Sequence, residues 1–309
     1  MSVRPAPLLL WLAAVLGATV YAAQNPPMIR DGRPLRMGVD LTVVTATVLD
    51  RDNHLVVGLP KDAFEVYEDG EPQAITQFTH ERVPIGLGLL LDVSDSMFGQ
   101  RIKDARSAVE RFLLELLSPS DAFFLMSFNH EPHLLTPWSS DADPVKTALA
   151  NIRPSGGTAI YDSVLSALPL MDQRTRERAA IVIISDGADT TSDTTLRDLR
   201  AALLRADTFV YAVAIDSPAR QPINTRVNPE ALGEITNPSG GHTTVVHDGA
   251  ELAAATARIA EELNSQYVIG YSSPHPGDGR YHSIRVRAGA GAYRVRARNG
   301  YVATSKTQM

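Results

Sequence analysis

An uninterrupted apolar run that ends abruptly in carboxylates and hydroxyls constrains the fold of this chain more than any other stretch. It lies within Pro84 to Met97. The run itself, Ile85 to Leu91, has the length and composition of a strand buried on both faces. Its polar continuation, Asp92-Val93-Ser94-Asp95-Ser96, therefore lies at the carboxyl end of a central strand, where ligands bind in open α/β sheets. Oxygen-bearing side chains at alternate positions suit a hard cation such as Mg²⁺.

Apolar runs and amphipathic segments alternate along the chain after this stretch. Strands are predicted at residues 121–128, 134–137, 179–185, 208–215, 242–246 and 266–271. Helices are predicted at residues 99–117, 144–152 with Asp143 as the cap, 159–171, 194–206, 229–235 and 249–264. The short gaps between them imply right-handed crossovers, and so an α/β fold with a doubly wound, mostly parallel sheet whose last strand is 266–271.

Both ends of the expected mature chain are rich in β pattern. Residues 37–80 alternate apolar and polar positions and include a hairpin with Asp69-Gly70 at its turn. Residues 280–303 alternate again, and the arginines at alternate positions there, Arg296 and Arg298 among them, are expected on the wet face. Because a lone hairpin is barely stable in water, we expect this C-terminal hairpin to pack with the N-terminal segment in a small β domain beside an α/β domain of residues 83–272.

The first residues resemble an export signal. Arg4, the apolar core Leu8 to Val20 and the small residues before Gln24 have the layout of a secretory signal peptide at residues 1–23. Residues 24–36, rich in proline and polar residues, are expected to be a linker. The apolar core is short for a membrane span of about 20 residues, so cleavage and a periplasmic or secreted location are expected. Retention as a membrane anchor is the alternative.

Charge and motif content exclude several classes of function. A net charge of −6 argues against a nucleic acid partner, which needs a basic surface. The chain has no cysteine and therefore neither disulfides nor thiolate metal sites. His130-Glu131-Pro132-His133 lacks the spacing of a zinc-protease motif, and the remaining histidines are scattered. No GxSxG elbow, P-loop or GxGxxG motif points to an enzyme.

The polar continuation of the central strand resembles the signature of a known family. Asp92 to Ser96 is similar to the DxSxS motif of von Willebrand factor type A (VWA) domains, whose metal-ion-dependent adhesion site (MIDAS) also takes a Thr and an Asp from two later loops. Gly156-Gly157-Thr158 and Ile184-Ser185-Asp186-Gly187 resemble those loops. Asp95 stands where many members have Gly. The flanking segments resemble bacterial VWFA-related proteins of the Acidobacteria type; these segments are Val66 to Gly70, Ser265 to Tyr271 and Arg296 to Tyr301.

The resemblance implies a metal site, a partner and a function. The implied ligands of Mg²⁺, with Mn²⁺ or Ca²⁺ as alternatives, are Asp92, Ser94, Ser96, Thr158 and Asp186. Such an ion takes its sixth ligand from an Asp or Glu of a partner protein, so the implied function is a non-enzymatic binding module for adhesion or assembly. Individually, Ser96 and Thr158 also suit helix caps.

Two other functions stay open. One is a Mg²⁺-dependent phosphotransferase or phosphatase of the haloacid dehalogenase type, which likewise begins with an apolar strand that ends in Asp. That chemistry needs an acid–base carboxyl two residues later, where this chain has Ser94. The other is a purely structural envelope component that assembles through its β domain.

Overall fold

The computed structural model describes residues 41–216 and 228–304, all of them within one compact unit. The predicted signal peptide and linker lie outside the described residues. A six-stranded sheet of order β10-β9-β8-β5-β6-β7 forms the centre of the α/β part. Its strands are β5 (Ile85–Asp92), β6 (Ala122–Phe128), β7 (Pro132–Ser139), β8 (Arg178–Ser185), β9 (Phe209–Ile215) and β10 (Thr243–Val246). All pairs are parallel except β6 with β7, so the expected mostly parallel sheet is confirmed.

Every residue of β5 is buried, because helices cover both faces of the sheet. Leu87, Leu89 and Leu91 point into one core cluster and Leu90 into the other, as alternation along a strand requires. Full burial of each such leucine stabilises the fold by about 1.5–3 kcal/mol. The strand also needs glycine, since a Cβ on Gly88 would lie 2.6 Å from a ring carbon of Phe124.

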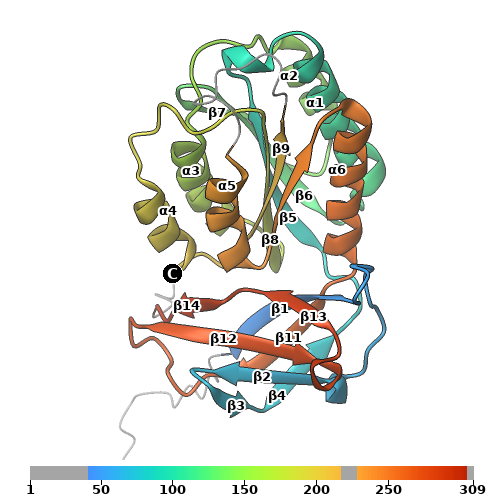
Figure 1. Ribbon diagram of the computed structural model, residues 1–309, viewed down its shortest axis with the longest axis vertical. Coiled ribbons are helices and arrows are strands. Elements are labelled where there is room, and N and C mark those ends of the chain that lie inside the picture. The colour runs from blue at the N-terminus through green and yellow to red at the C-terminus, as the bar shows by residue number, and fades with distance from the viewer. Residues whose placement is uncertain (1–40, 217–227, 305–309) are drawn as a thin grey trace, which may run out of the picture. The chain divides into compact units, whose positions relative to one another are not determined.

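Two sets of helices flank the sheet (Figure 1). One set packs on the face of Leu87 and consists of α1 (Gln100–Arg111), α2 (Asp143–Asn151) and α6 (Gly249–Asn264). The other packs on the face of Leu90 and consists of α3 (Ile160–Asp172), α4 (Leu196–Leu203) and α5 (Pro229–Thr236). A π-helical turn, Phe112–Leu116, continues α1. Asp143 is the first residue of α2 rather than its cap, which is Ala142.

The two ends of the described chain interleave in two antiparallel four-stranded sheets, of order β13-β1-β11-β4 and β14-β12-β2-β3. The strands are β1 (Leu41–Leu49), β2 (Phe64–Glu68), β3 (Glu71–Gln73), β4 (Ile75–Thr79), β11 (Tyr267–Ser272), β12 (Tyr281–Ala288), β13 (Arg294–Ala297) and β14 (Gly300–Val302). A third core cluster lies between them and includes Val44, Phe64, Tyr267 and Ile284. The expected fold class, an α/β sheet with a small β part built from N- and C-terminal segments, is therefore confirmed.

Two details of the β part correct the sequence predictions. Strand β11 does not close the parallel sheet; it pairs antiparallel with β1 and β4. The side chains of Tyr267, Ile269 and Tyr271 are buried in the third core cluster whereas Val268 and Ser272 on the other face are more exposed, as in an antiparallel strand with one well-covered face. The C-terminal segment is not a simple hairpin either, because β12 pairs with β2 and β14 whereas β13 pairs with β1.

Two tail arginines are not on a wet face as expected. The side chains of Arg296 and Arg298 are only 19% and 14% exposed. Arg296 forms an ion pair with the buried Glu262 of α6, and Arg298 lies 3.1 Å from Asp207, just before β9. Both arginines therefore connect the β part with the α/β part, and a buried carboxylate such as Glu262 needs that pairing.

Candidate metal centre

Asp92 ends the central strand and is completely buried. Its Oδ1 accepts a hydrogen bond of 2.8 Å from the backbone N–H of Ser94. Its Oδ2 accepts one from the hydroxyl of Ser185, the last residue of the neighbouring parallel strand β8. Because β5 and β8 run in register, their ends deliver Asp92 and Asp186 to the same edge of the sheet.

Ser94, Ser96 and Asp186 form a direct chain of oxygen atoms at that edge. The hydroxyl oxygens of Ser94 and Ser96 lie 2.9 Å apart. The Ser96 hydroxyl donates to Oδ1 of Asp186 over 2.6 Å. Ser94 and Asp186 are buried, and Ser96 is half-buried in the short 3₁₀ turn Asp95–Met97. The side-chain oxygens of three of the five predicted residues are thus in contact, although Asp186 lies 90 residues after Ser96 in the sequence.

Thr158 reaches the same edge through its loop. The N–H of Asp95 donates to the carbonyl of Gly156 over 3.0 Å, and the carbonyl of Thr158 accepts from the N–H of Thr190 over 2.8 Å. Glycine is required next to Thr158, because a Cβ on Gly157 would lie 2.4 Å from a methyl carbon of Thr191. The loop of Thr158 is therefore fixed against the Ser94–Ser96 turn by backbone contacts, whereas Ser94, Ser96 and Asp186 touch through their side chains.

Arg101 and Ser185 belong to the site but were not predicted from the sequence. Nη1 of Arg101, in the first turn of α1, lies 2.7 Å from Oδ2 of Asp186 and 2.6 Å from the carbonyl oxygen of Ser96. The amphipathic pattern that predicted α1 did not indicate a functional role for Arg101. Ser185 was visible as a polar residue at the end of an apolar run, which is the same signal that identified Asp92.

Burial disfavours the charged forms of both carboxylates of the site, and Arg101 already pairs with one of them, Asp186. Burial raises the pKa of Asp92 from 3.8 to about 7; hydrogen bonding from Ser185 opposes the shift, and the negative charge of Asp186 adds to it. Burial also raises the pKa of Asp186, against the hydrogen bond from Ser96 and the charge of Arg101. Two buried carboxylates among hydroxyls form an oxygen-only set of donors, which fits Mg²⁺ or a similar hard ion.

Three other acidic residues near the site are solvated or accept hydrogen bonds from backbone N–H groups. Asp95 is exposed. Asp162 and Asp189 serve as local turn and cap acceptors: Asp162 accepts from the N–H groups of residues 193 and 194, and Asp189 accepts from the N–H of Tyr161. Phe98, just after the 3₁₀ turn, is 78% exposed and leaves a large apolar ring at the rim of the site.

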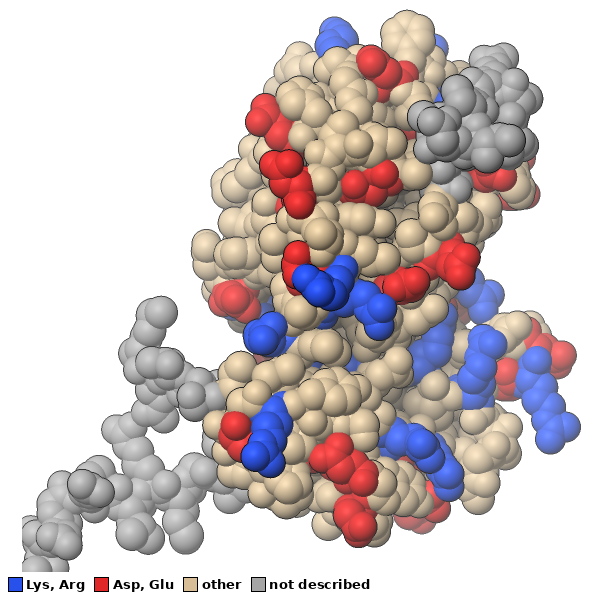
Figure 2. Space-filling model, turned by 60° about the vertical axis from the view of Figure 1, so that its left-hand side comes forward, with Lys and Arg blue, Asp and Glu red and all other residues tan. Residues whose placement is uncertain are grey.

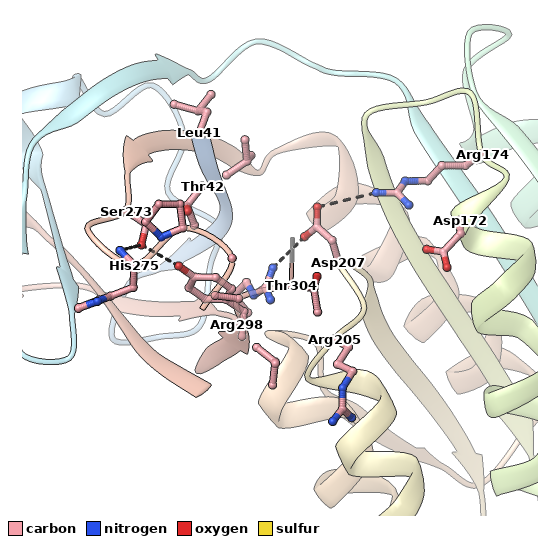
Figure 3. Close-up of a pocket in the computed structure, with 16 residues that line it drawn as sticks. Leu41, Thr42, Asp172, Arg174, Arg205, Asp207, Ser273, His275, Arg298 and Thr304 are labelled. Atoms are coloured by element: carbon pink, nitrogen blue, oxygen red, sulfur yellow. Dashed lines mark hydrogen bonds and ion pairs between the residues drawn. The ribbon is translucent and has the colours of Figure 1, made fainter. Parts of the chain in front are cut away.

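A cleft in the described part of the chain lies away from this site. It has a volume of about 560 Å³ and is lined by residues of both parts, including Arg174, Arg205 and Arg298 (Figure 3). Asp207 pairs with Arg174 and Arg298 inside it. On the face shown in Figure 2, several basic side chains gather across the middle while acidic ones are mixed around them.

None of the helices described here is long and apolar enough to cross a membrane.

Comparison with known proteins identifies the α/β part. A family model of the von Willebrand factor type A domain matches residues 87–188. Inter-alpha-trypsin inhibitor heavy chain H4 of Homo sapiens is 30% identical over 218 residues, 64% of this chain and 23% of that protein. The minor fimbrium subunit Mfa5 of Porphyromonas gingivalis is 29% identical over 116 residues, 35% of this chain and 9% of that protein. The chain spans less than a quarter of the length of either relative.

Solved structures share the fold at lower identity. A von Willebrand factor type A protein from Catenulispora acidiphila aligns with a TM-score of 0.52 and 14% identity over 87% of this chain and 74% of that chain. An aerotolerance-related membrane protein from Bacteroides fragilis aligns with a TM-score of 0.50 and 20% identity over 58% of this chain and 98% of that chain. Residues 87–188 therefore match a von Willebrand factor type A domain, and the described residues share the fold of such domains, built on the sheet whose central strand ends at Asp92.

Proposed function

We propose that this protein is an extracytoplasmic binding protein whose VWA domain holds a divalent cation and captures an acidic side chain of a partner protein. The proposed ligands are Asp92, Ser94, Ser96, Thr158 and Asp186, and Mg²⁺ is the preferred ion. When bound, the ion supplies an electrophilic centre that accepts a carboxylate oxygen. The residues of the chain orient it, restrict access of water and keep its charge only partly neutralised.

The contact between the Ser94, Ser96 and Asp186 oxygens beside the buried carboxyl of Asp92 is the observation that supports this proposal most. Hydroxyls at a helix cap need no buried carboxylate next to them, so capping alone does not explain the arrangement. A carboxyl that is driven toward its protonated form by burial is stabilised in its charged form when a cation binds. The same burial argues against the phosphotransferase alternative, because a nucleophilic Asp needs an open path to phosphate.

The rim of the site supports a protein partner. Phe98, two residues after Ser96, offers an exposed aromatic ring, and aromatic rings are enriched at the centres of protein interfaces. One relative is by its printed name a fimbrium subunit, which agrees with a role in adhesion or assembly outside the cytoplasm. The signal-peptide pattern of residues 1–23 agrees with the same location.

Metal binding is tested by thermal unfolding and calorimetric titration of the chelator-treated protein with Mg²⁺ and Mn²⁺. We expect about 2.7 kcal/mol of added stability at 100 times the dissociation constant. Asp92→Ala should lose this gain. Asp95→Ala removes an exposed carboxylate from the same turn and should keep it, which makes it the matched control. Equal stability of the wild type with and without metal would overturn the proposal.

Partner capture is tested by a pull-down from the envelope fraction of the source organism. A specific partner should be retained by the wild type and by Asp95→Ala in Mg²⁺ and released by EDTA. Asp92→Ala should not retain it under either condition. Retention that does not depend on metal or on Asp92 would instead favour a structural role of the β part.

A further inference from the structure

Four potential metal ligands meet in the β part, away from the VWA centre. Glu68 ends β2, Asp69 lies in the turn after it, His275 lies in the connection from β11 to β12, and His282 lies in β12. Each offers one ligand atom, and these atoms all lie within 4.8 Å of one another. The histidines looked scattered in the sequence, and they come together with the Glu68-Asp69 turn because β2 and β12 are paired.

His282 is oriented as a metal-binding histidine is. Its side chain is 6% exposed, and its Nδ1 lies 2.7 Å from Oδ2 of Asp69 and 3.9 Å from Oε1 of Glu68. Its other ring nitrogen, Nε2, lies 3.1 Å from Oδ1 of Asp278. A carboxylate on the far nitrogen typically fixes the tautomer and ring orientation of a metal-ligating histidine.

Glu68 supplies a second observation that favours cation binding at this cluster. It is 1% exposed, and its Oε1 accepts from the hydroxyl of Ser273 over 2.7 Å. Its Oε2 and the nearby hydroxyl of Tyr271 are both buried, and neither makes a hydrogen bond of good geometry within the described residues. Tyr271 thus gives Oε2 only a poorly oriented partner, and a bound cation would satisfy this buried oxygen fully.

The donor set differs from that of the VWA centre. Two imidazole nitrogens and two carboxylate oxygens suit Zn²⁺ or another first-row divalent ion, whereas Mg²⁺ prefers oxygen alone. A tetrahedral ion with bonds of about 2.0–2.1 Å separates its ligands by roughly 3.3 Å, so Asp69 and His282 need to part by only about half an ångström.

His275 provides both the last ligand and the route of entry. It is exposed, and with Ser273 it borders the large cleft (Figure 3). Its ring is stacked on that of His282, with centroids 4.5 Å apart and planes 6° from parallel. Parallel rings cannot direct their nitrogens to one point, so binding requires the exposed His275 ring to turn while the buried His282 ring stays in place.

We propose that Glu68, Asp69, His275 and His282 form a binding site for Zn²⁺ or a chemically similar first-row ion, with Asp278 as the positioning residue of His282. This site ties the turn after β2 to β12 and thereby joins the N- and C-terminal segments of the β part. It is independent of the VWA centre and stands whether or not that centre binds Mg²⁺.

The test is calorimetric titration of the chelator-treated full chain with ZnCl₂, in the Asp92→Ala background so that the VWA carboxylates do not compete. We expect one Zn²⁺ per chain and a rise in the thermal unfolding midpoint. Co²⁺ in place of Zn²⁺ should give the visible absorption of a four-coordinate site. Asp278→Asn should weaken binding about tenfold while leaving all four ligands in place.

Ligand variants decide the outcome. His275→Ala removes an exposed ring, so the metal-free protein should keep its unfolding midpoint while Zn²⁺ affinity falls at least tenfold. His80→Ala, an exposed histidine just after β4, is the matched control and should bind as the parent does. His282→Ala should abolish binding. No Zn²⁺ binding by the parent, or binding unchanged in both His275→Ala and His282→Ala, would overturn the proposal.

Discussion

Replacing Asp92 with Asn should make the metal-free protein more stable, although Asp92 lies at the proposed functional centre. Asn keeps the acceptor for the Ser94 N–H and offers an N–H to the rotatable hydroxyl of Ser185. What it removes is a carboxyl whose pKa burial raises from 3.8 to about 7. At about 1.4 kcal/mol per pKa unit, that shift disfavours the folded state by up to about 4 kcal/mol at pH 8.

The sign and pH range follow from linkage. The folded state keeps the Asp92 proton to a higher pH than the unfolded state does, so this group lowers the free energy of unfolding as pH rises from about 4 to about 7. The advantage of Asp92→Asn should therefore be up to about 4 kcal/mol at pH 8 and only about 2 kcal/mol at pH 5. Excess Mg²⁺ should stabilise the wild type and leave the variant unchanged.

The assay is urea unfolding in EDTA, followed by far-UV circular dichroism at pH 5, 6, 7 and 8. Comparison of midpoints at equal m-values isolates stability from changes in the unfolded state. Asp95→Asn, an exposed carboxyl in the same turn, should differ little from the wild type at any pH. The reasoning is refuted if Asp92→Asn is no more stable than the wild type at pH 8, or if its gain in stability does not grow with pH. Burial would then not control the pKa of the Asp92 carboxyl.

Three further variants concern residues that the sequence did not single out. Arg101→Gln removes the positive charge that lies 2.7 Å from Asp186. Calorimetry should therefore show that the variant binds Mg²⁺ about tenfold more tightly than the wild type. Weaker binding would mean that Arg101 instead positions Asp186 for the ion. Gly241→Ala should destabilise the fold by about 1–3 kcal/mol or more, because its Cβ would lie 1.9 Å from the carbonyl oxygen of Val210. Gly233→Ala lies inside α5, where the added Cβ would be 3.4 Å from the nearest atom, so this variant should stabilise the fold by about 1 kcal/mol. Thermal unfolding measures both glycine variants, and equal effects would contradict the packing argument.

The α/β part was predictable because its signals are local. Eight consecutive buried residues in β5 leave an unmistakable apolar run, and the polar residues that follow it lie at a known edge of such sheets. The same signal located Asp186 at the end of β8. The boundaries of the helices differ by a few residues from those expected, as is usual for helix ends.

The pairing of the β strands was not predictable in the same way. Alternation shows that a segment is a strand but not which strand it joins, so β11 was placed in the wrong sheet and β12 and β13 were joined in one hairpin. Arg101 was missed because its contact with Asp186 depends on how α1 packs near the end of β8, and the periodicity of hydrophobic residues does not predict that packing. The His275 and His282 cluster was missed for the same reason.

The interleaving of the chain ends bears on the order in which the protein folds during synthesis. Strand β1 pairs with β11 and β13, and one of the two partners of β2 is β12, so the first strands of the described chain have unpaired edges until these late strands are available. The VWA domain, inserted between them, contains its own local pairings and is able to condense first. Chains that end before Tyr267 would therefore leave the edges of β1 unpaired, where they are free to pair with other chains.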